Sequence, residues 1–84
     1  MKWKVIVAEP AAKQVAKFPA RDQQRIEAAI RAMTDDPFSG DTLKLQGVNN
    51  RWRRRVGHYR LMFNIFAPGT ILVSAVVRRT STTY

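Results

Sequence analysis

Apolar and polar residues alternate near the start of the chain and again through most of its second half. Trp3, Val5 and Val7 are separated by single residues, which predicts a short strand with these three side chains on one face. Three further strands are predicted, at residues 51–56, 59–66 and about 70–77. Tight turns are expected between them at Gly57-His58 and Pro68-Gly69, because these residue types adopt turn conformations at little cost.

Between the first strand and the other three, the residue pattern is typical of helices. A helix is expected from Glu9, with a proline in its first turn, to about Phe18, and Pro19 stops it. A second helix opens near Ala20 and ends within residues 34–37. Its apolar residues recur on one helical face and are expected to lie in the core: Ile26, Ala29, Ile30 and Met33. The two helices therefore form a hairpin that must cover an apolar surface.

These elements define an α+β fold. An N-terminal strand is followed by a two-helix hairpin and then by a three-stranded antiparallel meander, in the order β-α-α-β-β-β. The helices are expected to pack on one face of a mainly antiparallel sheet. At 84 residues the chain is expected to form a single domain, residues 1–84, with one modest core.

The two-residue turn at Gly57-His58 determines how its strands pair, with Val56 opposite Tyr59 and Arg55 opposite Arg60. Because side chains alternate across a sheet, two faces follow. The face expected beneath the helices holds Trp52, Val56, Tyr59, Leu61, Phe63 and Ile65. The open face holds Arg51, Arg53, Arg55, Arg60, Met62 and Asn64.

Two positions in this sheet have alternatives. Arg54 falls on the covered face, so either its stem crosses apolar surface to reach the rim or a bulge turns it outward. In the last strand, an even-numbered loop places Val73 and Val77 on the open face, whereas an odd-numbered loop buries more apolar surface. The odd loop is preferred, with Ile71, Val73, Ala75 and Val77 inside. It leaves on the open face Ser74, Val76 and Arg78, the last of them near Arg55 and Arg60.

Charge is distributed unevenly along the chain, whose net charge is +9 and whose isoelectric point is about 11.2. Residues 1–41 carry seven basic and all six acidic residues, whereas residues 42–84 carry eight basic residues and no acidic one. Such one-sided charge attracts polyanions, so a nucleic acid or an acidic protein is the expected partner. A membrane surface is disfavoured, because no helix pairs a basic face with a broad apolar one.

The open face is where this charge gathers. Arg55 opposite Arg60 is unfavourable by up to about 1 kcal/mol, because like charges repel across a strand pair. An uncompensated group of four arginines is explained if an anion binds among them, since guanidinium groups match phosphate oxygens in pairs.

Several function classes are disfavoured by composition. The chain has no cysteine and one histidine, His58, so neither a thiolate nor a multi-histidine metal site is expected, and no cofactor is implied. No apolar run approaches the roughly 20 residues that span a bilayer, and nothing resembles a secretory signal. The cytoplasm is the expected location.

Two segments resemble a known family. Lys44-Leu45-Gln46-Gly47 and the run from Trp52 to Arg60 resemble the K-L-x-G … W-R-x-R-x-G-D-Y-R core of the RelE/ParE toxins. The leading strand, the helical hairpin and the closing Val77-Arg78-Arg79…Tyr84 are similar to the same family, so the resemblance covers nearly the whole chain. It implies the toxin of a type II toxin–antitoxin system, with an antitoxin protein as its partner.

RelE-type members of that family cleave mRNA in the ribosomal A site without a metal. The 2′-hydroxyl attacks the adjacent phosphate and leaves a 2′,3′-cyclic phosphate and a 5′-hydroxyl. By this resemblance Arg60 and Arg78 hold the scissile phosphate, Arg53 and Arg55 bind the backbone and leaving group, and Tyr84 stacks on a base or orients the nucleophile. Further basic residues are expected to bind RNA: Lys44, Arg51, Arg54 and Arg79.

The chain departs from the family in its candidate bases. RelE has lysines where this chain has Arg53 and Arg55, and arginine stays protonated. His58 and Tyr84 are the remaining candidates, although His58 occupies a turn position and is better explained as a turn residue. Relatives often continue beyond the position of Tyr84, so a missing tail is one reading.

Two other functions therefore stay open. A ParE-type toxin inhibits DNA gyrase by binding and needs no base. A basic binding module that has lost catalysis would bind nucleic acid without arresting growth.

Overall fold

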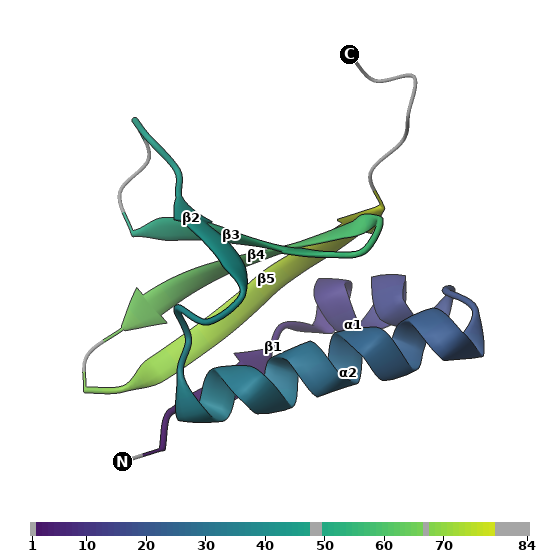
Figure 1. Ribbon diagram of the computed structural model, residues 1–84, viewed down its shortest axis with the longest axis horizontal. Coiled ribbons are helices and arrows are strands. Elements are labelled where there is room, and N and C mark those ends of the chain that lie inside the picture. Colours follow the sequence, from purple (N-terminus) through teal and green to yellow (C-terminus); the bar gives the residue numbers. More distant parts are fainter. Residues whose placement is uncertain (1, 48–49, 67, 79–84) are drawn as a thin grey trace.

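The computed structural model describes residues 2–47, 50–66 and 68–78, and places two helices along one face of a five-stranded sheet (Figure 1). The elements, in chain order, are β1 (Lys4–Val7), α1 (Glu9–Ala16), α2 (Ala20–Asp35), β2 (Asp41–Lys44), β3 (Arg51–Val56), β4 (Tyr59–Phe66) and β5 (Thr70–Arg78). The strand order is β1-β5-β4-β3-β2, with β1 parallel to β5 and every other pair antiparallel. The predicted α+β class is confirmed, and the sheet is mixed.

Strand β2 was not predicted. It pairs with β3 and extends the meander to four antiparallel strands. A further backbone hydrogen bond, 2.9 Å from Leu45 N–H to the Arg51 carbonyl, continues this pairing. Four residues are too few to show a clear alternation, which is why the pattern left this segment as a loop. Its presence adds the side chains of residues 41 and 43 to the open face.

The hairpin of β3 and β4 has the predicted register, with Val56 opposite Tyr59 and Arg55 opposite Arg60. Its turn depends on Gly57, whose φ of 58° lies in the left-handed region that side chains disfavour. The predicted covered face is confirmed, because all of its residues lie in or against the core cluster. The arginine positions of β3 and β4 consequently share the other face.

Strand β5 differs from its predicted register. Met62 pairs with Ala75 but Phe63 pairs with Val73, so Ser74 is an extra residue in a β-bulge. One inserted residue exchanges the two faces for all that follow. Ile71 and Val73 are buried as predicted, but the predictions for residues 75–78 are wrong.

Beyond the bulge the sides of β5 are reversed. Val76 is buried, whereas Val77 is 40% exposed opposite Arg60. Arg78 pairs with Tyr59 on the covered side, not with the arginines of the open face. Two side chains hold the bulge, because Gln14 accepts a hydrogen bond from Val76 N–H at 2.9 Å and the Ser74 hydroxyl donates to the Met62 carbonyl at 3.2 Å.

The core lies between α1, α2 and the covered face of the sheet. Its fully enclosed side chains include Ile26 and Met33 from α2 and Leu61, Phe63 and Ile71 from the sheet. Ile30, predicted to be a core residue, is only partly buried and packs against this cluster from its edge.

Replacing Ile26 with alanine is expected to lower the free energy of unfolding by about 2–5 kcal/mol, because the change leaves a cavity in a fully enclosed site. Ile30→Ala serves as the matched control on the same helix and should cost less. Chemical denaturation of both variants measures the difference. Equal losses, or no loss in Ile26→Ala, would show that α2 does not pack on the sheet in this way.

Candidate nucleic-acid interface

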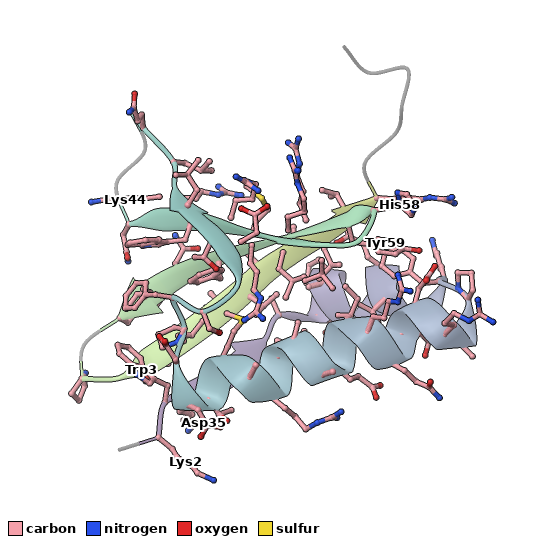
Figure 2. All side chains as sticks on the ribbon, in the orientation of Figure 1. Lys2, Trp3, Asp35, Lys44, His58 and Tyr59 are labelled. Atoms are coloured by element: carbon pink, nitrogen blue, oxygen red, sulfur yellow. The ribbon has the colours of Figure 1, made fainter. Side chains whose placement is uncertain are left out.

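Four arginines project from the open face of the sheet, on the side away from both helices. Arg51, Arg53 and Arg55 come from alternate positions of β3, and Arg60 comes from the facing position of β4. The tip of the hairpin, marked by His58 and Tyr59 in Figure 2, lies beside the Arg55–Arg60 pair. We call these four side chains the arginine cluster.

Two guanidinium nitrogens in the arginine cluster lack hydrogen-bond partners. Arg53 Nη1 and Arg60 Nε are both shielded from solvent and without an acceptor among the described residues. The Arg53 side chain is only 14% exposed, so water reaches little of it. A shielded charged donor that makes no hydrogen bond is costly, which favours an anionic acceptor binding here.

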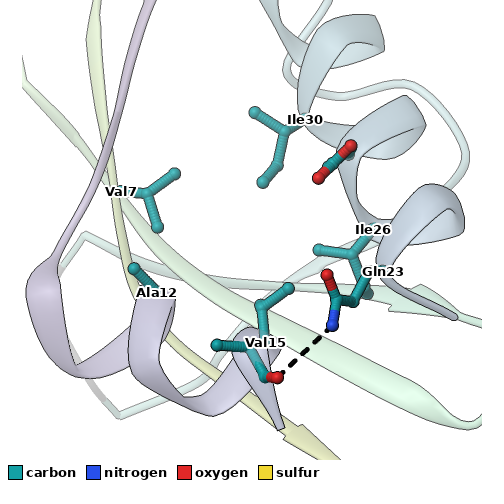
Figure 3. Close-up of a pocket in the computed structure, with 8 residues that line it drawn as sticks. Val7, Ala12, Val15, Gln23, Ile26 and Ile30 are labelled. Carbon is teal, nitrogen blue, oxygen red and sulfur yellow. Dashed lines mark hydrogen bonds between the residues drawn. The ribbon is translucent and has the colours of Figure 1, made fainter. Parts of the chain in front are cut away.

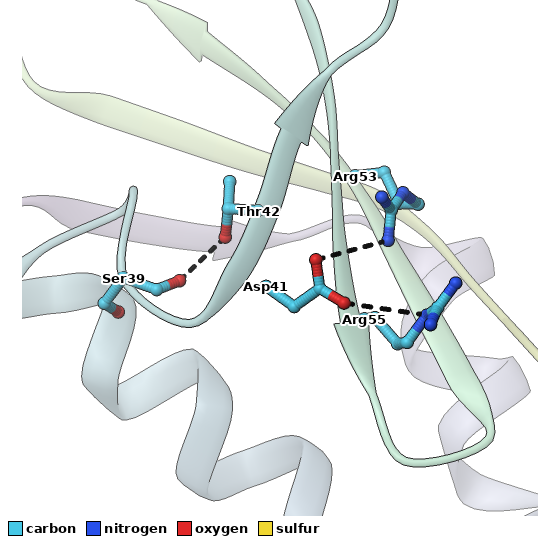
Figure 4. Close-up of polar contacts among 5 residues, drawn as sticks. All are labelled: Ser39, Asp41, Thr42, Arg53 and Arg55. Carbon is cyan, nitrogen blue, oxygen red and sulfur yellow. Dashed lines mark hydrogen bonds and ion pairs between the residues drawn. The ribbon is translucent and has the colours of Figure 1, made fainter.

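Asp41, at the start of β2, places its carboxylate beside the arginine cluster (Figure 4). Its Oδ1 lies 3.9 Å from Arg53 Nη1 and its Oδ2 lies 3.7 Å from Arg55 Nε. These separations are ion pairs and too long for direct hydrogen bonds. The carboxylate is 57% exposed and remains accessible. The expectation of an uncompensated cluster is therefore wrong, since Asp41 offsets part of the charge.

Asp41 was not predicted as a site residue because strand β2 was not predicted. Register places it directly opposite Arg55, and the adjoining turn is held by a hydrogen bond from the Thr42 hydroxyl to the Ser39 carbonyl at 2.7 Å (Figure 4). An antiparallel pairing of residues 41–44 with 52–55, around the turn containing Gly47, is the signal that would have placed it beside the arginines.

Two residues expected to bind RNA lie on the other side of the sheet. Lys44 pairs with Trp52 and shares its covered face. Arg54 keeps regular strand geometry, extends along the covered face, and donates from Nη1 to Ser39 Oγ at 3.1 Å. Burial lowers the pKa of its guanidinium, and the negative charge of Asp36 opposes that shift. Arg54 thus fastens the loop between α2 and β2.

The packing around Arg54 also explains Gly40. This residue has a φ of 70°, and a Cβ added there would lie 3.0 Å from Arg54 Nη2. Glycine therefore allows both the turn into β2 and the close approach of the guanidinium. That turn is what delivers Asp41 to the open face.

The remaining predicted site residues come from the end of the chain. Arg78 lies at the tip of the hairpin on the covered side, as the bulge dictates. Arg79 and Tyr84 lie outside the described residues. The structure consequently brings together Arg51, Arg53, Arg55 and Arg60 from the predicted set, and adds Asp41.

Tyr59 ties the hairpin to α2. Its hydroxyl donates to Asp22 Oδ2 at 2.6 Å, and its ring packs on Phe18 with centroids 4.3 Å apart. The hydrogen bond to Asp22 raises the pKa of Tyr59, with smaller contributions from burial and from the Asp22 charge, while Arg78 opposes the shift. The tyrosine next to Arg60 is therefore an anchor for the strand that carries it.

The raised pKa of Tyr59 predicts that the protein loses stability in alkaline solution. Because folding raises the pKa of Tyr59 above its ordinary value of 10.0, the folded state holds the hydroxyl proton more tightly than the unfolded chain does. The contribution of protonated Tyr59 to the free energy of unfolding is fully present below pH 10 and is lost as the pH rises through the folded-state pKa. Thermal midpoints measured between about pH 9 and 11 should fall less steeply for Tyr59→Phe than for the wild type. Identical pH dependences would contradict the assignment.

A shallow hollow of about 330 Å³ lies elsewhere, between β1, α1 and α2 (Figure 3). Most of its lining is apolar, including Val7, Val15 and Ile30. Gln23 closes one end by donating from Nε2 to the Phe18 carbonyl at 2.9 Å. The hollow brings together no set of groups suited to acid–base or phosphate chemistry, so the open face is the better candidate site.

Neither a metal site nor a membrane span stands out in the part of the chain that the structure describes. Within residues 2–47, 50–66 and 68–78, no group of three or more histidine, cysteine, aspartate or glutamate side chains could hold a metal ion. No helix in these ranges is long and apolar enough to cross a membrane. The chemistry that the described open face offers is binding of phosphate by guanidinium groups and acceptance of a proton by a carboxylate.

The fold is that of the RelE/ParE toxin structures. The chain superposes with a TM-score of 0.85 on a chain of the archaeal RelE–RelB complex from Pyrococcus horikoshii, at 19% identity over 98% of this chain and 100% of that one. For the isolated RelE toxin of E. coli the TM-score is 0.80, at 15% identity over 96% and 88% of the two chains. For the YoeB/ParE toxin of Agrobacterium tumefaciens it is 0.72, at 18% identity over 92% and 99%. No protein-family model matches the sequence, and no curated protein matches it either.

Proposed function

We propose that this chain is the toxin of a toxin–antitoxin system and cleaves mRNA in the A site of the ribosome, in the cytoplasm and without a metal. The observation that carries the proposal is the pair of shielded donors without a hydrogen bond, Arg53 Nη1 and Arg60 Nε, on the same face as the Asp41 carboxylate. Donors without acceptors fit a phosphate, and a carboxylate beside them fits a base. The shared fold with RelE structures supports the same reading.

The reaction we propose is attack of the RNA 2′-hydroxyl on the adjacent phosphate. Asp41 takes the proton from the 2′-hydroxyl, and the new O2′–P bond forms as the P–O5′ bond breaks. The products are a 2′,3′-cyclic phosphate and a 5′-hydroxyl, whose oxygen takes a proton from solvent. Arg53 and Arg60 stabilise the charge that grows on the phosphate oxygens, and Arg55 offsets charge on the leaving oxygen.

Residues at the end of the chain complete the proposal. Arg78 lies on the covered side, so Arg60 and Arg53 take the role of holding the scissile phosphate. Stacking of Tyr84 on a base and binding of backbone by Arg79 remain part of the proposal.

An acidic antitoxin is the proposed protein partner. Among the described residues, four of the five exposed large hydrophobic side chains lie on the open face, as the arginine cluster does: Ile6, Leu43, Phe66 and Val77. Three of these four side chains are aliphatic, whereas RNA bases stack on aromatic rings. A protein segment with acidic and apolar residues would contact both the arginines and the apolar side chains. Opposite charge would also speed the association of such a partner with a chain of net charge +9.

Mapping of mRNA 5′ ends tests the proposed function. The chain is expressed from a tight promoter beside translated and untranslated versions of one reporter. Cuts confined to the translated message support ribosome-dependent cleavage. Growth arrest without cuts, together with an SOS response and stalled gyrase, would support the alternative of a ParE-type gyrase inhibitor, which requires no base. Binding without arrest would indicate a basic module that has lost catalysis.

A further inference from the structure

A second group of basic side chains surrounds the tip of the β3–β4 hairpin, on the side opposite the arginine cluster. Arg78 pairs with Tyr59, the first residue of β4, and shares its covered face. Arg25 reaches the same tip from α2, since a Cβ added at Gly57 would lie 3.3 Å from Arg25 Nη1. His58, in the turn between the strands, is exposed (Figure 2). Positive charge therefore occupies both sides of one narrow hairpin end.

The acidic group nearby is already engaged. Asp22, three residues before Arg25 on α2, accepts the 2.6 Å hydrogen bond from the Tyr59 hydroxyl. Among the described residues, neither Arg25 nor Arg78 is in an ion pair, and both side chains are exposed. Asp22 offsets part of their charge but leaves the guanidinium donors free to bind an anion.

The arginine cluster reaches almost to the tip of the hairpin. Arg55 and Arg60 form the pair next to Val56 and Tyr59, so the arginine cluster ends one residue pair from the turn. A polyanion lying on the open face would meet Arg25 and Arg78 by passing over His58. Proteins that bind single strands commonly use such continuous basic tracks to follow the backbone over several nucleotides.

We propose that Arg25 and Arg78 form a second RNA-phosphate site, on the covered side of the hairpin tip, which binds the strand as it continues from the open face. This inference rests on the proposed function, because it requires RNA in the arginine cluster. The site binds and positions RNA and does not take part in bond cleavage. It extends the footprint beyond the scissile phosphate.

The test compares RNA length in fluorescence anisotropy with the full chain. The probes are labelled 2′-O-methyl oligonucleotides of about three and about ten nucleotides, which lack the attacking hydroxyl and cannot be cleaved. For Arg25→Ala/Arg78→Ala, affinity for the long probe should fall about tenfold, and the slope of log affinity against log salt should become shallower by about 1.4, or 0.7 for each lost phosphate contact. Affinity for the short probe should not change.

A matched control removes the same charge elsewhere. Lys2→Ala/Arg31→Ala also deletes two exposed basic side chains, with Lys2 at the opposite end of the molecule from His58 (Figure 2) and Arg31 about 9 Å along α2 from Arg25. This variant should retain affinity for both probes. Arg60→Ala should weaken binding of both, which separates failure of the tip site from failure of the proposed function.

Each outcome is decisive. Loss of affinity for the long probe alone supports a site for the same strand. Unchanged oligonucleotide binding with lost co-sedimentation on ribosomes, in the tip variant and not in the control, places a ribosomal RNA phosphate there instead. Unchanged binding in both assays overturns the proposal. Circular dichroism of each variant verifies that the fold is retained.

Discussion

Replacing Arg60 with alanine is expected to lower the rate of RNA cleavage about 10²–10³-fold, the loss typical when one group that stabilises transition-state charge is removed. The fold should not suffer. Arg60 faces Arg55 across the strand pair, where like charges cost up to about 1 kcal/mol, and its Nε is a shielded donor without an acceptor. Removing it relieves both penalties, so the thermal midpoint should stay the same or rise.

Cleavage of a defined mRNA on purified ribosomes, alongside thermal unfolding, measures both effects of Arg60→Ala. Arg31→Ala is the control, because it removes an exposed arginine of α2, the helix that packs on the covered face of the sheet. An unfolded Arg60→Ala protein would show that the side chain is structural. A folded variant with undiminished cleavage would remove Arg60 from the proposed site.

Replacing Asp41 with asparagine is expected to lower the cleavage rate about 10²–10⁴-fold, the contribution typical of a general base. RNA binding should be maintained or should tighten, because the change removes a negative charge that lies within 4 Å of Arg53 and Arg55. This combination distinguishes a base from a residue that merely orients the arginines, since loss of orientation would weaken binding as well.

Single-turnover cleavage and binding of an uncleavable RNA separate these two effects of Asp41→Asn. Asp35→Asn is the control, since it neutralises an exposed carboxylate at the end of α2. Its rate and affinity should equal those of the wild type. If Asp41→Asn cleaves at the wild-type rate, the proton goes to another group, and His58 becomes the next candidate.

The sequence predicts the arginine cluster well because a two-residue turn leaves little freedom. Once Gly57-His58 is recognised as a turn, the pairing of Arg55 with Arg60 follows from the period of a strand. The helices are equally local in origin, since Pro10 lies in the first turn of α1 and Pro19 is the residue that caps the start of α2.

Features that depend on contacts distant in sequence were not predictable. The bulge at Ser74 is held by Gln14, whose side-chain oxygen accepts a hydrogen bond from Val76 N–H. The two residues lie 62 positions apart in the sequence. Nothing in the alternation of residues 70–78 reveals that contact, so the side on which Arg78 lies was predicted wrongly. Asp41 belongs to the same class, because its position depends on pairing between two short segments across a turn.

The place of β5 in the sheet has a consequence for synthesis of the protein. This strand lies between β1 and β4, and it supplies the enclosed side chains Ile71, Val73 and Val76. Residues 4–7 therefore cannot pair until residues 70–73 have been synthesised. Pairing between segments so far apart in sequence is slow. The arginine cluster gains a stable support only after these residues have left the ribosome. Strand β1 therefore stays without its sheet partner until the residues of β5 have emerged.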